Sequence, residues 1–169
     1  MEMKLVSIAL GSNQGKREEN IRNALDLIAE AIGQIITCSP FYENEAQGFE
    51  SRDLFLNGCI VVESTLDPNK ILNALKAIES RLGRVTSPVD GYASRPIDLD
   101  IILIENHVVK EVDLEIPHPR FRERLFVLKP LSDIQFEAID PITLKSIGDL
   151  LNECEDSSQL RLYELKGLR

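Results

Sequence analysis

The sequence predicts an α+β domain, because segments of helical and of strand character alternate along it. Apolar residues recur at helical spacing in residues 18–33 and 67–83, and short aliphatic stretches lie before and after each of them. The resulting order is strand, helix, strand, strand, helix, strand, which is the split βαβ arrangement of ferredoxin-like folds. Such a βαββαβ core has a largely antiparallel sheet with both helices packed on one face. We expect its other face to carry a site or the additional C-terminal helices and strand.

The first strand and helix have clear ends in the sequence. Residues 4–10 are rich in Leu, Val and Ile and end at Gly11-Ser12-Asn13, which predicts a strand followed by a turn. A helix is expected from about Glu18, and Gly33 is placed to end it.

Two strands and a polar loop are predicted between the helices. Residues 34–43 form the second strand, in which Pro40 indicates an edge position or a bulge. Residues 44–53 are polar and aperiodic, as in surface segments that often carry binding residues. Residues 54–64 form the third strand, and its start, Phe55-Leu56-Asn57, places one polar residue among apolar ones.

The second helix is expected to begin with Asp67 as its cap and Pro68 at its first position, and to end at Gly83. A loop over residues 84–94 then leads into the fourth strand. Beyond this core we expect further elements, namely a short strand at 108–112, partly helical residues at 121–134, a helix at 142–151 and a closing strand at 159–165.

The fourth strand carries two acidic residues in an otherwise aliphatic run, Asp98 and Asp100. Because successive side chains alternate between faces, the two carboxylates share one face and Ile97, Leu99 and Ile101 take the other. Buried carboxylates cost several kcal/mol unless each finds a cation or strong donors. With no histidine or cysteine beside them, they suit a hard ion such as Mg²⁺. A structural network with nearby arginines is the alternative.

Basic side chains are concentrated in one third of an otherwise acidic chain. The net charge of −9 argues against general binding to nucleic acid or an anionic membrane. Because the arginine guanidinium matches phosphate oxygens, the basic third predicts a polyphosphate site, with a solvated surface as the alternative. Its members are Arg81, Arg84, Arg95, His118, Arg120, Arg122, Arg124 and Lys129.

The length of 169 residues predicts a single domain over residues 1–169. Its three cysteines are widely spaced and form no C-x-x-C pair, which predicts neither a disulfide framework nor a zinc site, and so a cytoplasmic location. The N-terminal apolar run is too short for a signal peptide, and no segment approaches the length of a membrane helix.

Six motifs in order and at compatible spacing give the chain a family resemblance from about residue 5 to residue 132. They are Gly11-Ser12-Asn13, Phe55-Leu56-Asn57, Glu79 to Gly83-Arg84, Arg95-Pro96-Ile97-Asp98-Leu99-Asp100, Pro117-His118-Pro119-Arg120 and Arg124-Leu125-Phe126. Together they resemble the 6-hydroxymethyl-7,8-dihydropterin pyrophosphokinase family. Its members transfer pyrophosphate from ATP to the pterin hydroxymethyl group in folate biosynthesis and release AMP.

The resemblance implies roles for named residues. Asp98 and Asp100 would hold two Mg²⁺ ions against the phosphates of the co-substrate ATP, and Arg84 and Arg95 would complete the catalytic set. The nucleotide-binding positions that it implies are Glu79, Arg84, Tyr92, Arg95, Ile101, His118 and Arg124. The general base stays open between Asp98 and a water molecule on the metal.

The resemblance also implies a binding site for the pterin. Phe55 and Phe126 would sandwich the flat ring, Asn57 would hydrogen-bond its edge, and Gly48 would lie in the adjoining loop. Plain core packing is the alternative for both phenylalanines. The partners would be the small-molecule substrates ATP and 6-hydroxymethyl-7,8-dihydropterin, with no nucleic acid and no membrane, and we expect a monomer.

Two loops depart from the family pattern. Asn44-Glu45-Ala46-Gln47-Gly48 stands where the family usually has Thr-x-Pro-x-Gly, and the segment before Pro96 retains only Tyr92 and Arg95 of the usual aromatic and basic residues. We expect the second departure to weaken nucleotide binding or to slow loop closure.

Two other functions fit the same core. A palm-like nucleotidyl transferase also uses a ferredoxin-like sheet with two metal-binding aspartates, although the acidic net charge counts against it. A ferredoxin-like small-molecule sensor, in which the acids only balance arginines, is the non-enzymatic alternative. Formation of AMP from ATP and the pterin would separate the three.

Overall fold

The computed structural model describes residues 2–45, 54–83 and 96–166. Its elements, in order, are β1 (Lys4–Ser12), α1 (Arg17–Ala31), β2 (Gln34–Cys38), β3 (Phe41–Asn44), β4 (Phe55–Ser64), α2 (Pro68–Arg81), β5 (Asp98–Ile104), β6 (Val109–Lys110), β7 (Glu115–Ile116), the 3₁₀ turn η1 (Phe121–Glu123), α3 (Leu125–Gln135), α4 (Ile147–Glu153) and β8 (Arg161–Tyr163).

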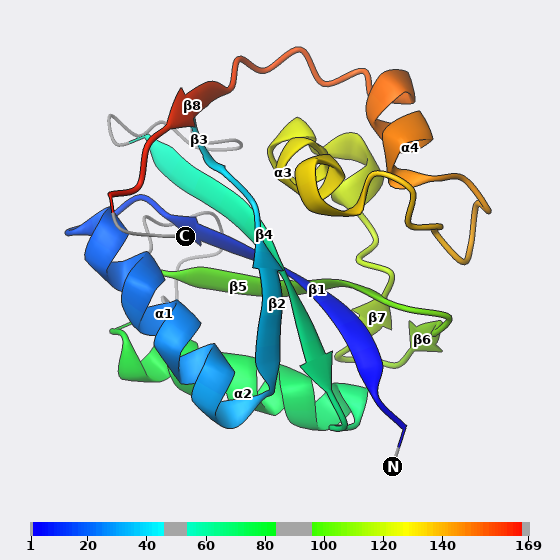
Figure 1. The fold of residues 1–169 in the computed structure, drawn as a ribbon, viewed down its shortest axis with the longest axis horizontal. Helices are drawn as coiled ribbons and strands as arrows, with labels where there is room; N and C mark the ends of the chain where they lie inside the picture. Colours follow the sequence, from blue (N-terminus) through cyan, green and yellow to red (C-terminus); the bar gives the residue numbers. More distant parts are fainter. Residues whose placement is uncertain (1, 46–53, 84–95, 167–169) are drawn as a thin grey trace.

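The molecule is built on one antiparallel sheet with the strand order β5-β1-β4-β3-β8, in which β2 also pairs with β4 (Figure 1). The fourth, first, third and second predicted strands therefore lie side by side in that order. The predicted ferredoxin-like α+β core is confirmed, and the C-terminal strand β8 extends it at the edge of β3.

The second predicted strand is in fact two strands. β2 and β3 both pair with β4, and they are separated at Ser39-Pro40. Proline has no N–H to give to a ladder, and Ser39 bridges the gap instead, because its hydroxyl accepts the Cys59 N–H at 2.9 Å. The predicted interruption at Pro40 is confirmed.

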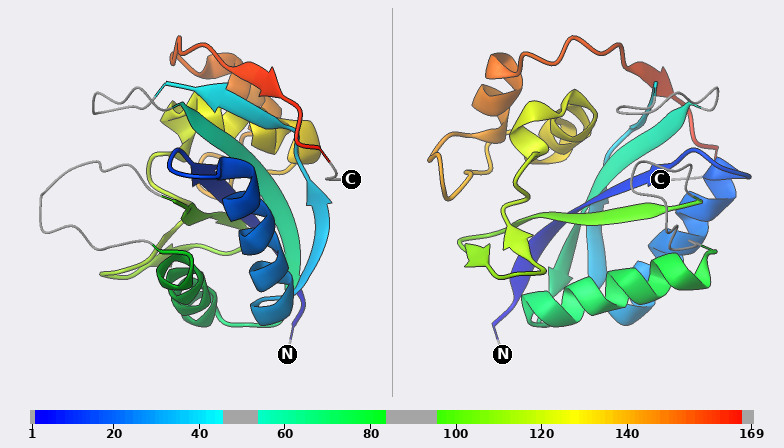
Figure 2. Two further views of the ribbon diagram at one scale, coloured as in Figure 1. Left: turned by 90° about the vertical axis from the view of Figure 1, so that its left-hand side faces the viewer. Right: turned by 180° about the vertical axis from the view of Figure 1, so that it is seen from behind.

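Helices α1 and α2 lie together on one face of the sheet (Figures 1 and 2). Their apolar stripes pack with Val6, Ile8 and Leu10 of β1 and with Leu56 and Ile60 of β4 in the larger core of the molecule. Gly33 ends the first helix because a Cβ there would lie 1.9 Å from the Glu63 carbonyl oxygen. The helix can therefore turn directly against β4 only at a glycine.

The opposite face is covered by η1, α3 and α4, which form a second core with Cys59 and Ile102 (Figure 2). Helix α3 is also tied to the sheet by polar contacts, because the Tyr42 hydroxyl donates to Asp133 and the Cys59 thiol lies 3.7 Å from the Val127 carbonyl oxygen. The expectation of additional C-terminal helices on this face is confirmed. This face is called the α3 face below.

Three predicted details are wrong in part. Asp67 occupies the N-cap position of α2 but makes no side-chain cap hydrogen bond. The last helix begins at Ile147 rather than at residue 142, because the buried Asp140 carboxylate accepts the Ile142 N–H and the Thr143 hydroxyl and holds this stretch in a turn. The closing strand is confined to three residues, Arg161–Tyr163.

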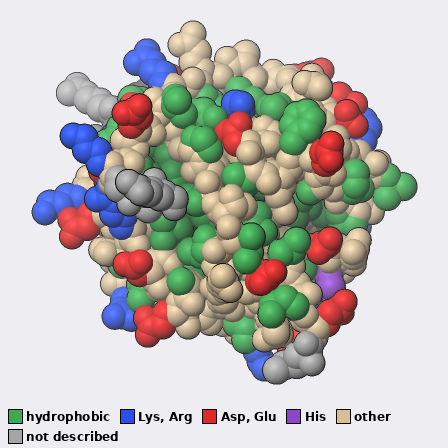
Figure 3. All heavy atoms as spheres, in the orientation of Figure 1, with side chains coloured by type: hydrophobic (Ala, Val, Ile, Leu, Met, Phe, Trp, Pro, Cys, Tyr) green, Lys and Arg blue, Asp and Glu red, His purple; other side chains and the backbone are tan. Residues whose placement is uncertain are grey.

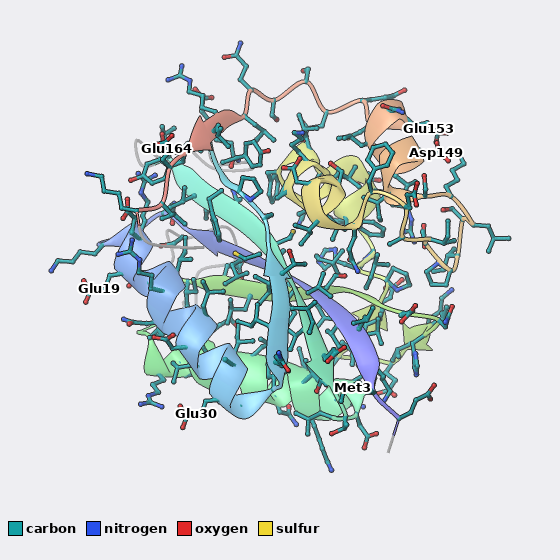
Figure 4. The ribbon with its side chains drawn as sticks, in the orientation of Figure 1. Met3, Glu19, Glu30, Asp149, Glu153 and Glu164 are labelled. Atoms are coloured by element: carbon teal, nitrogen blue, oxygen red, sulfur yellow. The ribbon has the colours of Figure 1, made fainter. Side chains whose placement is uncertain are left out.

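Most charged side chains of the described residues lie on the outside of the fold, and Glu79 and Asp140 are buried exceptions. Figure 3 shows acidic side chains spread over the visible face rather than gathered in one patch. In Figure 4, Glu19 and Glu30 project from α1 and Glu153 projects from α4, and all three are exposed. None of the described helices has the length and apolar character needed to cross a membrane.

Candidate active site

The candidate site lies on the α3 face, where three strands bring their polar residues into register. Gly11 of β1 pairs with Asn57 of β4 on one side and with Asp98 of β5 on the other. Two residues along, Ala9 lies between Cys59 and Asp100 in the same way. Directly paired residues project to the same face, and Cys59 belongs to the core under α3. Asn57, Asp98 and Asp100 therefore all project to the α3 face.

The two aspartates are half-buried at the start of β5, which is an edge strand. Ile97, Leu99 and Ile101 pack on the opposite side in the core under α1 and α2. The predicted division of this strand into an acidic face and an apolar face is confirmed. The Leu99 N–H donates to the Glu79 carboxylate of α2 at 3.1 Å, so a buried acid from the helix holds the edge of the strand between the two aspartates.

His118 is brought to the same place by a backbone hydrogen bond. Its N–H donates to the Ile102 carbonyl oxygen at 2.8 Å, which lays the segment after the cis Ile116–Pro117 bond along the edge of β5. Its Nδ1 accepts the Arg120 N–H at 3.1 Å. With Nδ1 acting as an acceptor, the proton of the neutral ring lies on Nε2.

The charges around His118 show which groups are close to it. Burial and the Arg124 guanidinium lower its pKa to about 4, Asp98 acts in the opposite direction, and Arg120 lowers it further. The ring is therefore neutral at pH 7 and offers an N–H donor rather than a positive charge. Asp98, His118 and Arg124 form one electrostatic group.

Arg124 and Phe126 lie where the chain enters α3. The Arg124 guanidinium lies over the Phe126 ring, 5.7 Å from its centroid, which is within the range of a cation–π contact. The first N–H of the helix, at Leu125, donates to the Asp156 carboxylate at 2.9 Å, so this entry is held by the C-terminal segment.

Arg122 serves a different purpose from its neighbours in the basic third. Its guanidinium forms a bidentate pair with the buried Asp140, with nitrogen–oxygen distances of 2.6 and 2.9 Å. This pair connects the turn between His118 and Arg124 to the loop before α4.

Phe55 and Asn57 lean over the backbone of Gly11. A Cβ at this glycine would lie 2.6 Å from Asn57 Oδ1 and 3.8 Å from Phe55 Cδ1. The missing side chain therefore leaves room for both groups on the α3 face. The Asn57 amide in turn donates to Asn44 of β3, a neighbour that sequence reasoning did not assign to the site.

The structure brings seven of the predicted site residues into one region, and they are Asp98, Asp100, His118, Arg124, Phe55, Asn57 and Phe126. The side chain of Ile101 lies in the helix-side core, and Glu79 lies on that side as well. Four predictions, Gly48, Arg84, Tyr92 and Arg95, fall outside the described residues. Gly11 was not predicted as a site residue. The one indication of its role in the sequence is its place in the Gly11-Ser12-Asn13 turn.

The donor set suits one type of metal. In the part of the chain that the structure describes, no group of three or more His, Cys, Asp or Glu side chains is arranged to hold an ion. Two carboxylates alone fit Mg²⁺, which is usually held by one or two carboxylates together with substrate phosphates and water. Asp98 and Asp100 could hold such an ion when a phosphate ligand supplies the remaining oxygens.

These features define a class of α+β protein that presents paired carboxylates, cationic and hydrogen-bonding groups, and an aromatic and amide surface on one face of its sheet. The sequence profile of the family described as 7,8-dihydro-6-hydroxymethylpterin-pyrophosphokinase (HPPK) matches residues 7–136. The chain belongs to this family.

Relatives of this chain occur as separate proteins and as parts of longer ones. A 2-amino-4-hydroxy-6-hydroxymethyldihydropteridine pyrophosphokinase from Porphyromonas gingivalis is 42% identical over 134 residues, which are 78% of this chain and 91% of the relative. The Bacillus subtilis protein of the same name is 38% identical over 75% of each chain. The mitochondrial folate synthesis bifunctional protein of Pisum sativum is 39% identical over 83% of this chain, but that is only 27% of its own length.

Solved structures agree on the fold. A crystal structure of HPPK-DHPS in complex with substrates matches with a TM-score of 0.71 and 18% identity over 90% of this chain. The wild-type Plasmodium falciparum HPPK-DHPS with pteroate matches with a TM-score of 0.73 and 16% identity, also over 90%. This chain spans 43% and 42% of those two chains.

Proposed function

We propose that this chain transfers the pyrophosphoryl group of ATP to the hydroxymethyl group of 6-hydroxymethyl-7,8-dihydropterin, with release of AMP, as a step of folate biosynthesis. Membership of the HPPK family supports an ATP-dependent dihydropterin pyrophosphokinase. We assign two Mg²⁺ ions to Asp98 and Asp100 and the pterin to Phe55, Asn57 and Phe126.

One observation carries this assignment, namely the row Asn57–Gly11–Asp98 across the sheet. Two strand spacings separate the outer members, which is about 10 Å between their Cα atoms. A ring held at Asn57 would therefore place a short substituent near the aspartates, and the gap at Gly11 leaves its path clear. An alcohol attached to a flat ring by one carbon fits this separation.

The remaining residues suit the phosphate side of the reaction. His118 would donate its Nε2–H to a phosphate oxygen, and Arg124 would neutralise charge beside it while its guanidinium stays over Phe126. Mg²⁺, when bound, would neutralise the phosphates and fix the geometry of in-line transfer. Arg84 and Arg95 remain proposed phosphate ligands on the family resemblance alone.

We also propose a cytoplasmic monomer. The thiols of Cys38, Cys59 and Cys154 are all free in the structure, as expected in a reducing compartment.

The first test is product formation. Purified protein with Mg²⁺, ATP and the hydroxymethyl dihydropterin should yield AMP and the pterin diphosphate, measured by chromatography. Release of ADP, or no product, would refute the pyrophosphokinase assignment.

The second test concerns the metal. We expect Asp98→Ala and Asp100→Ala each to lower kcat at least about 100-fold, as removal of a key electrostatic group typically does. Asp67→Ala is the matched control, because Asp67 is exposed and makes no side-chain cap hydrogen bond. Near-normal turnover in both aspartate variants would contradict the assignment of Mg²⁺ to Asp98 and Asp100. It would not affect the assignment of the chain to its family.

A further inference from the structure

Two buried amide side chains meet beside the candidate ring site. Asn57 of β4 and Asn44 of β3 project to the α3 face, and they are 7% and 4% exposed. Asn57 Nδ2 donates to Asn44 Oδ1, and Asn44 Nδ2 donates to the Glu45 carbonyl oxygen at 3.0 Å. The hydrogen bonds therefore run in one direction, from Asn57 through Asn44 to the backbone.

The backbone end of this chain sets the orientation of both amides. A carbonyl oxygen can only accept, so the Glu45 carbonyl requires the NH₂ group of Asn44 to face it. Asn44 must then present its oxygen to Asn57, and Asn57 must present its NH₂ group in return. Rotation of either amide by 180° would bring two acceptors together, which leaves a buried polar group without its hydrogen bond.

The consequence lies on the other side of Asn57. Its Oδ1 projects over the backbone of Gly11, towards β5. Among the described residues, no hydrogen-bond donor reaches this oxygen, and none of their side-chain nitrogens or oxygens is both buried and unpartnered. Oδ1 is thus an accessible acceptor that faces the space between Asn57 and Asp98.

We propose that Asn44 is a positioning residue that holds Asn57 with its oxygen towards the substrate, so that the site selects a ring whose edge donates hydrogen bonds. The inference rests on the proposed function. With the hydroxymethyl group directed to the aspartates, the opposite end of the ring, which carries the N–H and amino donors of the pyrimidine, meets Asn57. A site built around such a hydrogen bond rejects an analogue that lacks the donor.

The test measures binding of the dihydropterin in the presence of Mg²⁺ and a non-hydrolysable ATP analogue. Asn44→Leu keeps the volume and removes the acceptor, so we expect the pterin Kd to rise about 10-fold, as for loss of one buried hydrogen bond. The ATP-analogue Kd and kcat should stay within about two-fold of wild type, on the same scale. Asn44→Asp keeps the acceptor for Asn57 but turns its second oxygen to the Glu45 carbonyl. We therefore expect it to lose stability but to keep the preference for the 2-amino group. Asn69→Leu is the matched control, because Asn69 is exposed and bonds only Glu111 among described side chains.

Two further measurements separate positioning from general damage. If Asn44 acts through Asn57, then Asn44→Leu combined with Asn57→Ala should bind the pterin no more weakly than Asn57→Ala alone. The wild type should also prefer the dihydropterin to its analogue without the 2-amino group, and Asn44→Leu should lose that preference. This comparison in the wild type does not depend on how well any variant folds.

Three results would overturn the inference. They are additive losses in the double variant, equal losses of pterin and nucleotide binding in Asn44→Leu, or a wild type that does not distinguish the two pterins. If the wild type makes AMP and one of these results is found, the positioning role of Asn44 is refuted and the proposed function is not. A wild type that makes no AMP refutes the proposed function itself.

Discussion

His118 illustrates how the surroundings of a single side chain decide its chemistry. Burial and Arg124 lower its pKa to about 4, and its Nδ1 is already occupied by the Arg120 N–H. A phosphate at this position would meet a neutral donor with a fixed direction, whereas the arginines supply the charge. In the proposed role, the histidine would contribute orientation rather than neutralisation.

The lowered pKa gives a pH prediction for the metal-free protein. The unfolded chain takes up a proton at His118 near the ordinary pKa of 6.5, and the folded protein does so only near 4. Between these values the unfolded state binds more protons, so His118 reduces the free energy of unfolding as the pH falls from 6.5 to 4 and has no such effect above 6.5.

NMR titration of the imidazole should give a midpoint near 4. In chemical unfolding, the stability of the wild type relative to His118→Gln should fall over the same pH range. His107, in the turn after β5, gives the only other imidazole signal in the same spectra, so the two must be assigned before the titration is read. A His118 midpoint near 6.5 would contradict the buried, Arg124-flanked setting.

Substitution of Phe126 can distinguish a role in binding the pterin ring from a role in core packing. It is half-buried and lies under Arg124, whereas its helix neighbours Val127 and Leu128 are fully part of the core. We expect Phe126→Ala to weaken pterin binding at least about 10-fold, since aromatic stacking and burial contribute more than about 1 kcal/mol. Nucleotide binding should change less than three-fold by the same conversion.

Isothermal titration with each ligand measures both effects of Phe126→Ala. The control is Phe136→Ala, which removes a ring of the same size that is 54% exposed at the end of α3. Equal losses of pterin and nucleotide binding in Phe126→Ala would indicate a packing role.

At the level of elements, the segment from His118 to Arg124 is held at both ends and in the middle. One backbone hydrogen bond, from the His118 N–H to Ile102, attaches its start to β5. Asp156 caps the helix that follows, and the pair Arg122–Asp140 anchors the turn between them. Burial raises the pKa of Asp140, but hydrogen bonds from Arg122, Thr143 and the Ile142 N–H outweigh it and leave the pKa below its usual value. The carboxylate is thus charged at neutral pH.

Removal of this anchor should affect stability and phosphate binding together. Asp140→Ala leaves Arg122 without its bidentate partner, and we expect the free energy of unfolding to fall by about 1–3 kcal/mol, or Tm by about 2–12 °C. The ATP affinity should fall more than the pterin affinity, because the turn carries His118 and Arg124.

Differential scanning calorimetry and nucleotide titration measure these effects. Glu153→Ala is the control, because it breaks the Lys145–Glu153 pair near the same loop, but at an exposed position that projects from α4 in Figure 4. Such surface pairs contribute less than about 1 kcal/mol. A similarly small change in Tm and in ATP affinity in both variants would show that the buried pair Arg122–Asp140 does not stabilise the turn.

The boundaries of elements were predicted less well than their existence, and for a physical reason. Helices α1 and α2 were predicted from their periodic apolar stripes and from the glycines at their ends, which are local signals. The start of the last predicted helix was misplaced because Asp140 accepts two hydrogen bonds from Arg122 and one each from the Ile142 N–H and the Thr143 hydroxyl. A hydrogen bond between side chains 18 residues apart produces no periodic pattern in the sequence, so it could not be predicted there.

For the whole molecule, the sequence predicted the sheet and its two faces, since aliphatic runs and helix stripes determine which side is buried. Strand alternation also predicted that Asp98 and Asp100 share one face, and the register brings Asn57 to that face as well. The sequence could not identify Asn44 or the gap at Gly11, because both depend on which strands become neighbours.

If protein and ATP each supply some of the oxygens around Mg²⁺, then binding of Mg²⁺ and binding of ATP should be coupled. In the proposed assignment, Asp98 and Asp100 would hold Mg²⁺ weakly until phosphate oxygens complete its shell. Mg²⁺ alone should therefore leave Tm within about 1 °C, whereas Mg²⁺ with an ATP analogue at 100 times its Kd should add about 2.7 kcal/mol to the free energy of unfolding. A full increase in Tm with Mg²⁺ alone, or an undiminished increase with analogue and EDTA, would contradict the shared coordination.

The row Asn57–Gly11–Asp98 has a consequence for how substrate size can vary among such proteins. The interval between its outer members is set by backbone hydrogen bonding in the sheet, and no side-chain substitution changes it. A longer tether between ring and alcohol would carry the hydroxyl past the carboxylates, and a shorter one would leave it over β1. Acceptance of a larger or smaller alcohol therefore requires a new position for the ring itself, and no adjustment at the acidic end can substitute for that.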